Sequence, residues 1–246
     1  MVKLLYHQYF KMHQPPRGSN HPERPERLDT LRKALREYGL DDMVERVTPR
    51  LGDLRIFEEV HSLAYVLDII GDLESALDTF FLDPDTYISP GTEQALKALA
   101  GSVVEALDLV EEDSVFIAGR PPGHHAGRDG QAMGAITQGF CIFNTAALLA
   151  VRLSRKGKTV VLDFDVHHGN GTQEILLDHP AIVHVDLHQD YRTIYPWTGP
   201  PTLRGKGNLY NINLPPGSGD DVYQEALEFA ASIIEAAQPD YLVVSA

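Results

Sequence analysis

The sequence predicts an α/β fold in which a mostly parallel sheet is flanked by helices on both faces. Short apolar, β-branched runs alternate with amphipathic helical segments along the chain, which is the pattern of such a sheet. The 246 residues are 43% hydrophobic and 23% charged, an ordinary globular composition. No repeat, low-complexity tract or long linker interrupts the pattern. We therefore expect a single domain over residues 1–246, a length at which one core can still be filled.

The first half of the chain opens with a short apolar strand at residues 2–6. Residues 25–38 then form an amphipathic helix that Gly39 ends. The apolar face of this helix consists of Leu28, Leu31, Leu35 and Tyr38. Further helices are expected at residues 54–70 and 92–110, and a buried strand at residues 114–118.

The glycine-rich residues 119–139 predict a long irregular loop, and such loops in compact domains are usually functional. Helices are expected next at residues 145–155 and 220–237, and strands at residues 158–163, 182–187, 209–214 and 241–245. The chain stops at Ala246, at the carboxyl end of the last strand, where the crevice of an open parallel sheet lies. We expect a further loop and helix there, so the fold is expected to lack its C-terminal part.

Charge and cysteine content limit the partners. A net charge of −14 repels nucleic-acid phosphate, so direct nucleic-acid binding is not expected. The charge would attract cationic partners, although solubility is the simpler explanation. Cys141 is the one cysteine, which fits a reducing compartment, and no segment is apolar for long enough to span a bilayer. We expect a cytoplasmic protein without a membrane partner, and the oligomeric state is not indicated.

The segment DFDVHHGNG, residues 163–171, directly follows an apolar strand. Alternate residues of an extended segment share a face, so Asp163, Asp165 and His167 should point the same way into the crevice. Carboxylate oxygen and imidazole nitrogen are both good zinc ligands. A polar loop with capping aspartates is the alternative, but these side chains would repel or desolvate one another without a cation. The sequence thus predicts zinc at Asp165 and His167.

The segment RPPGHHA places His124 and His125 side by side in the long loop. Adjacent histidines near a metal suggest general acid–base catalysis, and each needs a partner that fixes its tautomer. Asp163 and Asn170 could supply one each. Two exposed loop histidines are the alternative.

Aromatic side chains are the weaker signals. Gly139 beside Phe140 suggests close approach of the backbone to a ligand, although core packing explains the pair better. Tyr195 and Trp197 could line a slot or only pack. Cys141 has no adjacent basic partner and is expected to be buried rather than nucleophilic. Three further histidines are expected to be structural: His61, His179 and His184.

Together these motifs resemble the histone deacetylase and acetylpolyamine amidohydrolase family. The motifs are HPERPERL, the VHS before Tyr65, RPPGHHA, GFCIFN, VVLDFDVHHGNGTQ, VHVDLH and YPWTG. They cover essentially the whole chain, and the asparagine after HHG is typical of class II and many prokaryotic members. The resemblance implies the arginase-deacetylase fold. It also implies zinc-dependent hydrolysis of acetyl-lysine or an acetylpolyamine to acetate and the free amine.

The resemblance implies a role for each matching residue of the catalytic centre. Asp165 and His167 would bind zinc, and His125 would be the general base. His124 would be the electrostatic partner of His125, hydrogen-bonded to Asp163.

The resemblance also implies roles around the centre. Asn170 would orient His125, and Gly139 would offer its carbonyl to the substrate amide. Phe140 and Tyr195 would wall a substrate tunnel, and Arg27 would lie near an acetate exit. Family members bind potassium beside the zinc, and the matching residues are Asp163, Asp165, His167, Asp186 and Leu187.

One departure from the family concerns the missing ligands. In the family, the strand resembling YLVVSA is followed by a Gly-Phe-Asp segment that carries the third zinc ligand. A later glycine-rich loop brings a tyrosine or histidine that stabilises the oxyanion. Neither lies within these 246 residues, so we expect the chain as given to be nearly inactive.

Two other functions are weighed against this one. An arginase-type hydrolase with two manganese ions needs Asp-x-His-x-Asp, and Gly169 stands where the second aspartate is required. A degenerate deacetylase acting as a non-catalytic binding module would explain the missing residues without truncation.

Overall fold

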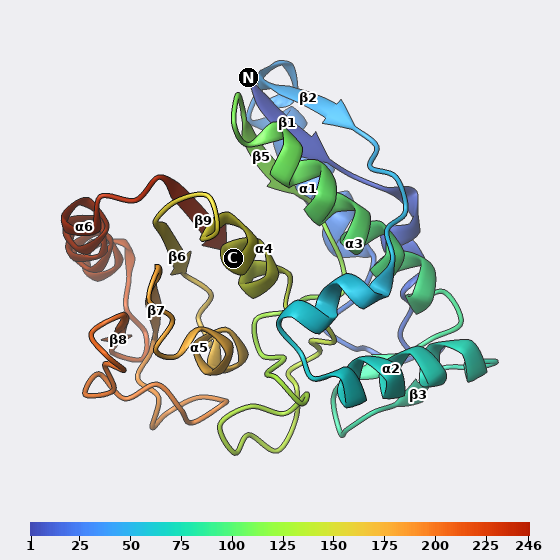
Figure 1. The fold of residues 1–246 in the computed structure, drawn as a ribbon. Helices are drawn as coiled ribbons and strands as arrows, with labels where there is room; N and C mark the ends of the chain where they lie inside the picture. Colours follow the sequence, from blue (N-terminus) through green and yellow to red (C-terminus); the bar gives the residue numbers. More distant parts are fainter. The chain divides into compact units, whose positions relative to one another are not determined.

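The structure, a computed structural model, describes residues 1–246. It consists of two units, each with its own parallel sheet (Figure 1). Unit 1 contains residues 1–58 and 62–122, and unit 2 contains residues 59–61 and 123–246. The expectation of a single domain over the whole chain stays a prediction. No helix combines the length and the hydropathy that crossing a membrane requires.

The sheet of unit 1 has the strand order β2-β1-β5, with β1 (Val2–Leu5) parallel to both β2 (Val44–Val47) and β5 (Ser114–Ile117). The long helix α3 (Thr92–Leu109) packs against β1 and β5. Gly101 inside α3 is required by close packing, because a Cβ there would lie 1.6 Å from the carbonyl oxygen of Arg50. The strand predicted at residues 114–118 is present, but it is not buried as expected, since Phe116 is 42% exposed.

Helix α1 (Glu26–Glu37) ends where the sequence predicts, with Gly39 at φ +66°. Leu28 and Leu35 are buried, but Tyr38 is 78% exposed because it follows the last helical turn and no longer shares the apolar face. The predicted helix at residues 54–70 is instead two elements, the 3-10 helix η3 (Leu54–Glu59) and α2 (Leu63–Ser75), which Ser62 caps through its hydroxyl. The remaining elements of unit 1 are η1 (Gln8–Met12), η2 (Asp41–Met43), β3 (Phe80–Phe81) and β4 (Tyr87–Ile88).

The sheet of unit 2 has the order β8-β7-β6-β9 and is parallel throughout. Its strands are β6 (Thr159–Asp163), β7 (Ile182–Gln189), β8 (Leu209–Leu214) and β9 (Tyr241–Ser245). The register pairs Asp163 at the end of β6 with Asp186 on one neighbour and Ser245 on the other. Polar side chains from three strands therefore meet at the carboxyl edge of this sheet.

Helices cover both faces of this sheet: α6 (Asp220–Ala237) lies on one face, and α4 (Thr145–Leu153) and α5 (Asn170–Leu176) lie on the other (Figure 1). The core under α6 is formed by Val160, Val185, Leu187, Leu214, Ala226 and Ala230. Mostly parallel sheets flanked by helices are the predicted fold class, which is confirmed.

Candidate active site

Two adjacent histidines in unit 2 each contact a different partner. His124 Nδ1 lies 3.0 Å from Asp163 Oδ2, and His125 Nδ1 lies 2.8 Å from Asn170 Oδ1. The Asn170 amide nitrogen donates to the carbonyl of Ala132 at 2.9 Å, which fixes the oxygen toward His125. An amide oxygen only accepts, so His125 carries its proton on Nδ1 and keeps the lone pair of Nε2 free.

The pKa values of the two histidines are shifted in opposite directions. Burial alone would lower the pKa of His124, but the Asp163 carboxylate outweighs burial and raises the pKa to about 9. Burial lowers the pKa of His125 well below its usual value, and the positive charge of His124 lowers it further. At neutral pH, His124 is therefore an imidazolium and His125 a neutral imidazole. Only the neutral ring can accept a proton.

Helix α5 and two glycines hold the histidine loop in place. The backbone N–H of Thr172, in the first turn of α5, donates to the carbonyl of His124 at 3.0 Å. A Cβ at Gly171 would lie 2.4 Å from the backbone of Ala126, and one at Gly123 would lie 2.4 Å from the carbonyl oxygen of Phe143. The loop approaches both neighbouring segments so closely that only glycine fits at these two positions.

His61 takes part in this scaffold, which the sequence did not reveal. Its Nδ1 lies 2.7 Å from the carbonyl oxygen of Gly127, and its Nε2 accepts the N–H of Asn144 at 2.9 Å. The Asn144 side chain in turn donates to Ala126 and to Thr172 and caps α4. His61 lies between η3 and α2 rather than within a regular element, and the VHS motif was its only signal.

The predicted zinc ligands lie side by side. Asp165 Oδ1 is 3.0 Å from His167 Nδ1 and also accepts the backbone N–H of His167 at 2.8 Å. Although burial raises the pKa of Asp165, the hydrogen bond from His167 and the His124 charge outweigh burial and hold the carboxyl ionised. A carboxylate oxygen and an imidazole nitrogen this close together suit two positions around one zinc ion. No group of three or more His, Cys, Asp or Glu in residues 1–246 is arranged to hold a metal ion, so the described donor set is this pair.

The residues matched to the potassium ligands occupy the adjoining ends of β6 and β7. Asp186 is buried and accepts the N–H of Gly169 at 2.9 Å, and its other oxygen lies 2.7 Å from His188 Nδ1. Leu187 points to the opposite face, with its side chain in the core under α6. A contribution of Leu187 to a cation would therefore use its backbone oxygen, and cation binding here stays a prediction.

Gly139 and Tyr195 lie beside the histidines. Gly139 has φ +52°, and a Cβ there would lie 2.4 Å from the His125 ring and 3.0 Å from the Tyr195 ring. The Tyr195 ring stands edge-on to His125 at 5.0 Å and to His167 at 6.1 Å, while its hydroxyl donates to the carbonyl of Thr137. Phe140 follows at φ +71° and is partly buried. The backbone at Gly139 thus packs closely against the rings of His125 and Tyr195, and its approach to a ligand stays a prediction.

Two other residues singled out in the sequence, Cys141 and Arg27, do not belong to the histidine cluster. Cys141 is fully buried, its Sγ contacts the backbone N–H of His125 at 3.4 Å, and burial raises its thiol pKa, so it is no nucleophile. Arg27 belongs to unit 1, where its exposed guanidinium lies 3.8 Å from Glu23. Its role near an acetate exit stays a prediction.

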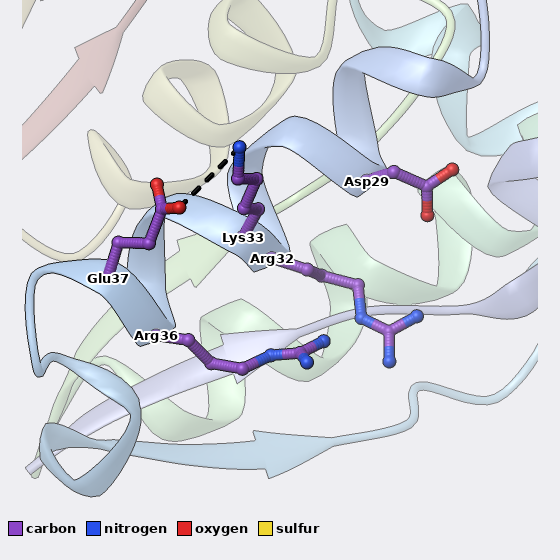
Figure 2. A pocket seen from close by; sticks show the side chains of 5 residues that line it. All are labelled: Asp29, Arg32, Lys33, Arg36 and Glu37. Atoms are coloured by element: carbon purple, nitrogen blue, oxygen red, sulfur yellow. Dashed lines mark ion pairs between the residues drawn. The ribbon is translucent and has the colours of Figure 1, made fainter.

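A hollow of about 360 Å³ lies on α1 in unit 1 and is distinct in chemistry from the histidine site (Figure 2). Its lining consists of Asp29, Arg32, Lys33, Arg36 and Glu37. The Lys33 ammonium lies 3.5 Å from Glu37, and the hollow has no general base or metal-ligand pair comparable to the histidine site. It is a charged surface depression rather than a catalytic centre.

Known proteins resemble this chain over nearly its whole length, not only at the site. The model of the histone deacetylase domain matches residues 21–246. An uncharacterized protein of Methanocaldococcus jannaschii is 40% identical, with 100% of this chain and 71% of that protein covered. A probable deacetylase of Archaeoglobus fulgidus is 33% identical over 99% of this chain and 67% of its own length. The histone deacetylase-like amidohydrolase of Pseudomonas aeruginosa is 35% identical, and the chain spans 62% of its length.

Two solved structures share the fold over 100% of this chain. The HDA15 HD domain has a TM-score of 0.86 at 28% identity, and 71% of it is covered. An acetylpolyamine aminohydrolase from Burkholderia pseudomallei has a TM-score of 0.83 at 25% identity, and 82% of it is covered. Because one family accounts for residues 21–246 and both neighbours superpose on the full chain, this protein belongs to the histone deacetylase domain family and has its arginase-deacetylase fold.

Proposed function

We propose that this chain carries the centre of a zinc-dependent deacetylase that hydrolyses an acetylated amine to acetate and the free amine. The observation that supports this most is the asymmetry of the two histidines. One is protonated by its carboxylate partner, and the other is held neutral by burial and by the neighbouring positive charge of His124. A neutral general base and a positive charge near the developing oxyanion both accelerate hydrolysis of an amide, and the pair supplies both.

In this mechanism His125 takes the proton of the attacking water on Nε2, since Asn170 keeps the other nitrogen protonated. The His124 imidazolium beside it, at a ring separation of 4.0 Å, favours the negative charge that develops on the substrate. Asp165 and His167 would hold the zinc, which supplies Lewis-acid activation when bound. Asp163, Asp186 and the backbone of Leu187 would hold potassium. Gly139, Phe140 and Tyr195 would wall the path of the acyl amine.

The 246-residue polypeptide is expected to turn over slowly. Zinc in catalytic sites usually has three protein ligands, and the described donor set offers two. Weak zinc binding would lower the fraction of active molecules. A degenerate deacetylase that only binds acetylated or cationic ligands is the alternative that the same experiment distinguishes.

The test compares hydrolysis of an acetyl-lysine peptide and of N-acetylputrescine with zinc present. We expect His125→Ala to lower the rate by about 10²–10⁴-fold. His179→Ala, which changes a histidine outside the site, is the matched control and should leave the rate unchanged. Zinc affinity, measured by competition with a chelator, should fall in Asp165→Ala but not in His125→Ala.

Each outcome separates the candidates. Equal rates for His125→Ala and the control would show that this pair does not catalyse the reaction. Zinc-dependent ligand binding without any hydrolysis would favour the binding module. A rate equal to that of the Pseudomonas aeruginosa relative would contradict the expected low turnover while supporting the function.

A further inference from the structure

Trp197 is the only tryptophan of the chain, and its conformation is unfavourable. Its side chain is 57% exposed, and its backbone has φ +60°, in the left-handed region that bulky residues avoid. An exposed apolar ring and a left-handed backbone both cost stability, and glycine at this position would remove both costs. Residues kept in such conformations tend to lie at binding sites.

The indole lies beside the candidate active site. Its ring centroid is 5.9 Å from that of Tyr195, at an interplanar angle of 77°. Tyr195 stands edge-on to His125, so one aromatic ring separates the indole from the general-base candidate. A substrate whose amide reaches His125 along Tyr195 would bring its other end to Trp197.

The turn that carries Trp197 is anchored on both sides. The Trp197 N–H donates to the carbonyl of Ile194, and Thr198 Oγ1 lies 2.8 Å from the buried His168 ring. The Gly199 carbonyl accepts from Asn213, and a Cβ at Gly199 would lie 2.6 Å from His168. The exposed indole is therefore presented from a fixed backbone.

The segment that carries Trp197 has no unpaired basic side chain that would repel a cation. Arg192 is the only basic residue in positions 190–199, and its Nε lies 3.0 Å from Asp190, which neutralises it. The chain as a whole carries a net charge of −14. The face of an indole is the aromatic surface that attracts an ammonium group best.

We infer that Trp197 forms a subsite for the distal ammonium of an acylated diamine or polyamine. The acetyl-lysine side chain has no second ammonium, so this subsite would favour acylated polyamines over acetyl-lysine. The inference rests on the proposed function for the placement of the amide beside His125.

The test compares two ligands of equal length, N-acetylputrescine and N-pentylacetamide, in which a methyl group replaces the ammonium. Affinities are measured by calorimetry at fixed zinc, and fluorescence of the single tryptophan reports contact with the indole. We expect the cationic ligand to bind about two- to fivefold more tightly, the range for an exposed cation–π contact. It should also perturb the fluorescence more than the neutral ligand does.

Trp197→Gly should remove the preference, since glycine also accepts φ +60° without strain. Phe229→Ala is the matched control, because Phe229 on α6 is 56% exposed, and it should keep the preference. An unchanged ratio in Trp197→Gly, or an equal loss in Phe229→Ala, would overturn the inference. So would a preference that salt abolishes equally in wild type and Trp197→Gly, because the net charge would then explain it.

Turnover separates this inference from the proposed function. A Trp197-dependent preference without hydrolysis of either amide would support the subsite and count against the deacetylase. Hydrolysis of both amides with no preference would support the deacetylase and overturn the subsite.

Discussion

Each unit contains a buried polar cluster that includes a sequence motif. The two clusters differ in how many of their hydrogen-bond donors and acceptors have partners. In unit 1, Arg120 donates Nε to Glu23 at 2.7 Å, Nη1 to the carbonyl of Phe10 and Nη2 to the carbonyl of His13. The Tyr87 hydroxyl donates to Glu23 as well. In unit 2, His125 makes one side-chain hydrogen bond and leaves its second nitrogen free.

The difference shows how a structural cluster is told from a chemical one. The guanidinium of Arg120 and the carboxylate of Glu23 are satisfied by each other and by backbone carbonyls, so nothing is left to act on a ligand. His125 is as deeply buried, yet it keeps an unshared lone pair and a neutral charge. Burial alone therefore does not distinguish the two clusters, whereas the free second nitrogen of His125 does.

The largest expected effect is on the cluster of unit 1. Glu23→Ala leaves the Arg120 charge buried without its partner, which should lower the free energy of unfolding by about 3–5 kcal/mol. Urea denaturation followed by circular dichroism measures this. The double variant Glu23→Leu with Arg120→Met removes both charges and should lose much less. If the single and double variants were equally stable, the cluster would not work as a charge pair.

Low pH should destabilise unit 2 through protonation of His61. Burial lowers the pKa of His61 to about 4, although its hydrogen bond to Gly127 opposes this. The unfolded chain, with a histidine pKa near 6.5, binds the proton first, so the contribution of His61 is complete above about pH 6.5. This contribution to the free energy of unfolding, about 3 kcal/mol in total, is lost as the pH falls toward 4.

His61→Gln should therefore reduce the loss of stability between those two pH values, as measured by thermal unfolding across the range. His179→Gln, at a less buried histidine, serves as the control. Parallel pH profiles for wild type and His61→Gln would show that His61 does not hold the histidine loop through its neutral form.

The smallest effect concerns the strained turn beside the site. Trp197→Gly relieves the left-handed backbone at the expense of the contact with Tyr195, so the free energy of unfolding should rise by up to about 1 kcal/mol. Thermal unfolding measures it. A large loss of stability would mean that the indole packs as a core side chain, and the contrast between a functional unit 2 site and a structural cluster would weaken.

Most strands of the two parallel sheets were predictable because they are short β-branched runs, such as residues 159–163. The strand β2, with the sequence VERV, escaped prediction since half of it is charged. Helix α5 was missed because its first residues, Asn170 and Gly171, are poor helix formers. Its formation depends on tertiary contacts, including the bond from Thr172 to the His124 carbonyl.

In the site, the spacing within the motifs was informative, whereas the contacts of His61 left no local signal. The alternation of Asp163, Asp165 and His167 predicted that they would converge, and the structure brings them together. The bond of His61 to Asn144 joins residues 83 positions apart, and no local pattern encodes it. The same holds for Glu23 and Arg120, which lie 97 positions apart.

The three residues 59–61 belong to unit 2 although the rest of that unit begins at residue 123. During synthesis on a ribosome, His61 emerges long before Gly127 and Asn144, the two backbone groups that it joins. Unit 2 therefore cannot complete its scaffold by folding its own continuous stretch and must take up a segment made earlier. A gene split at residue 122 would separate the histidine loop from part of its support.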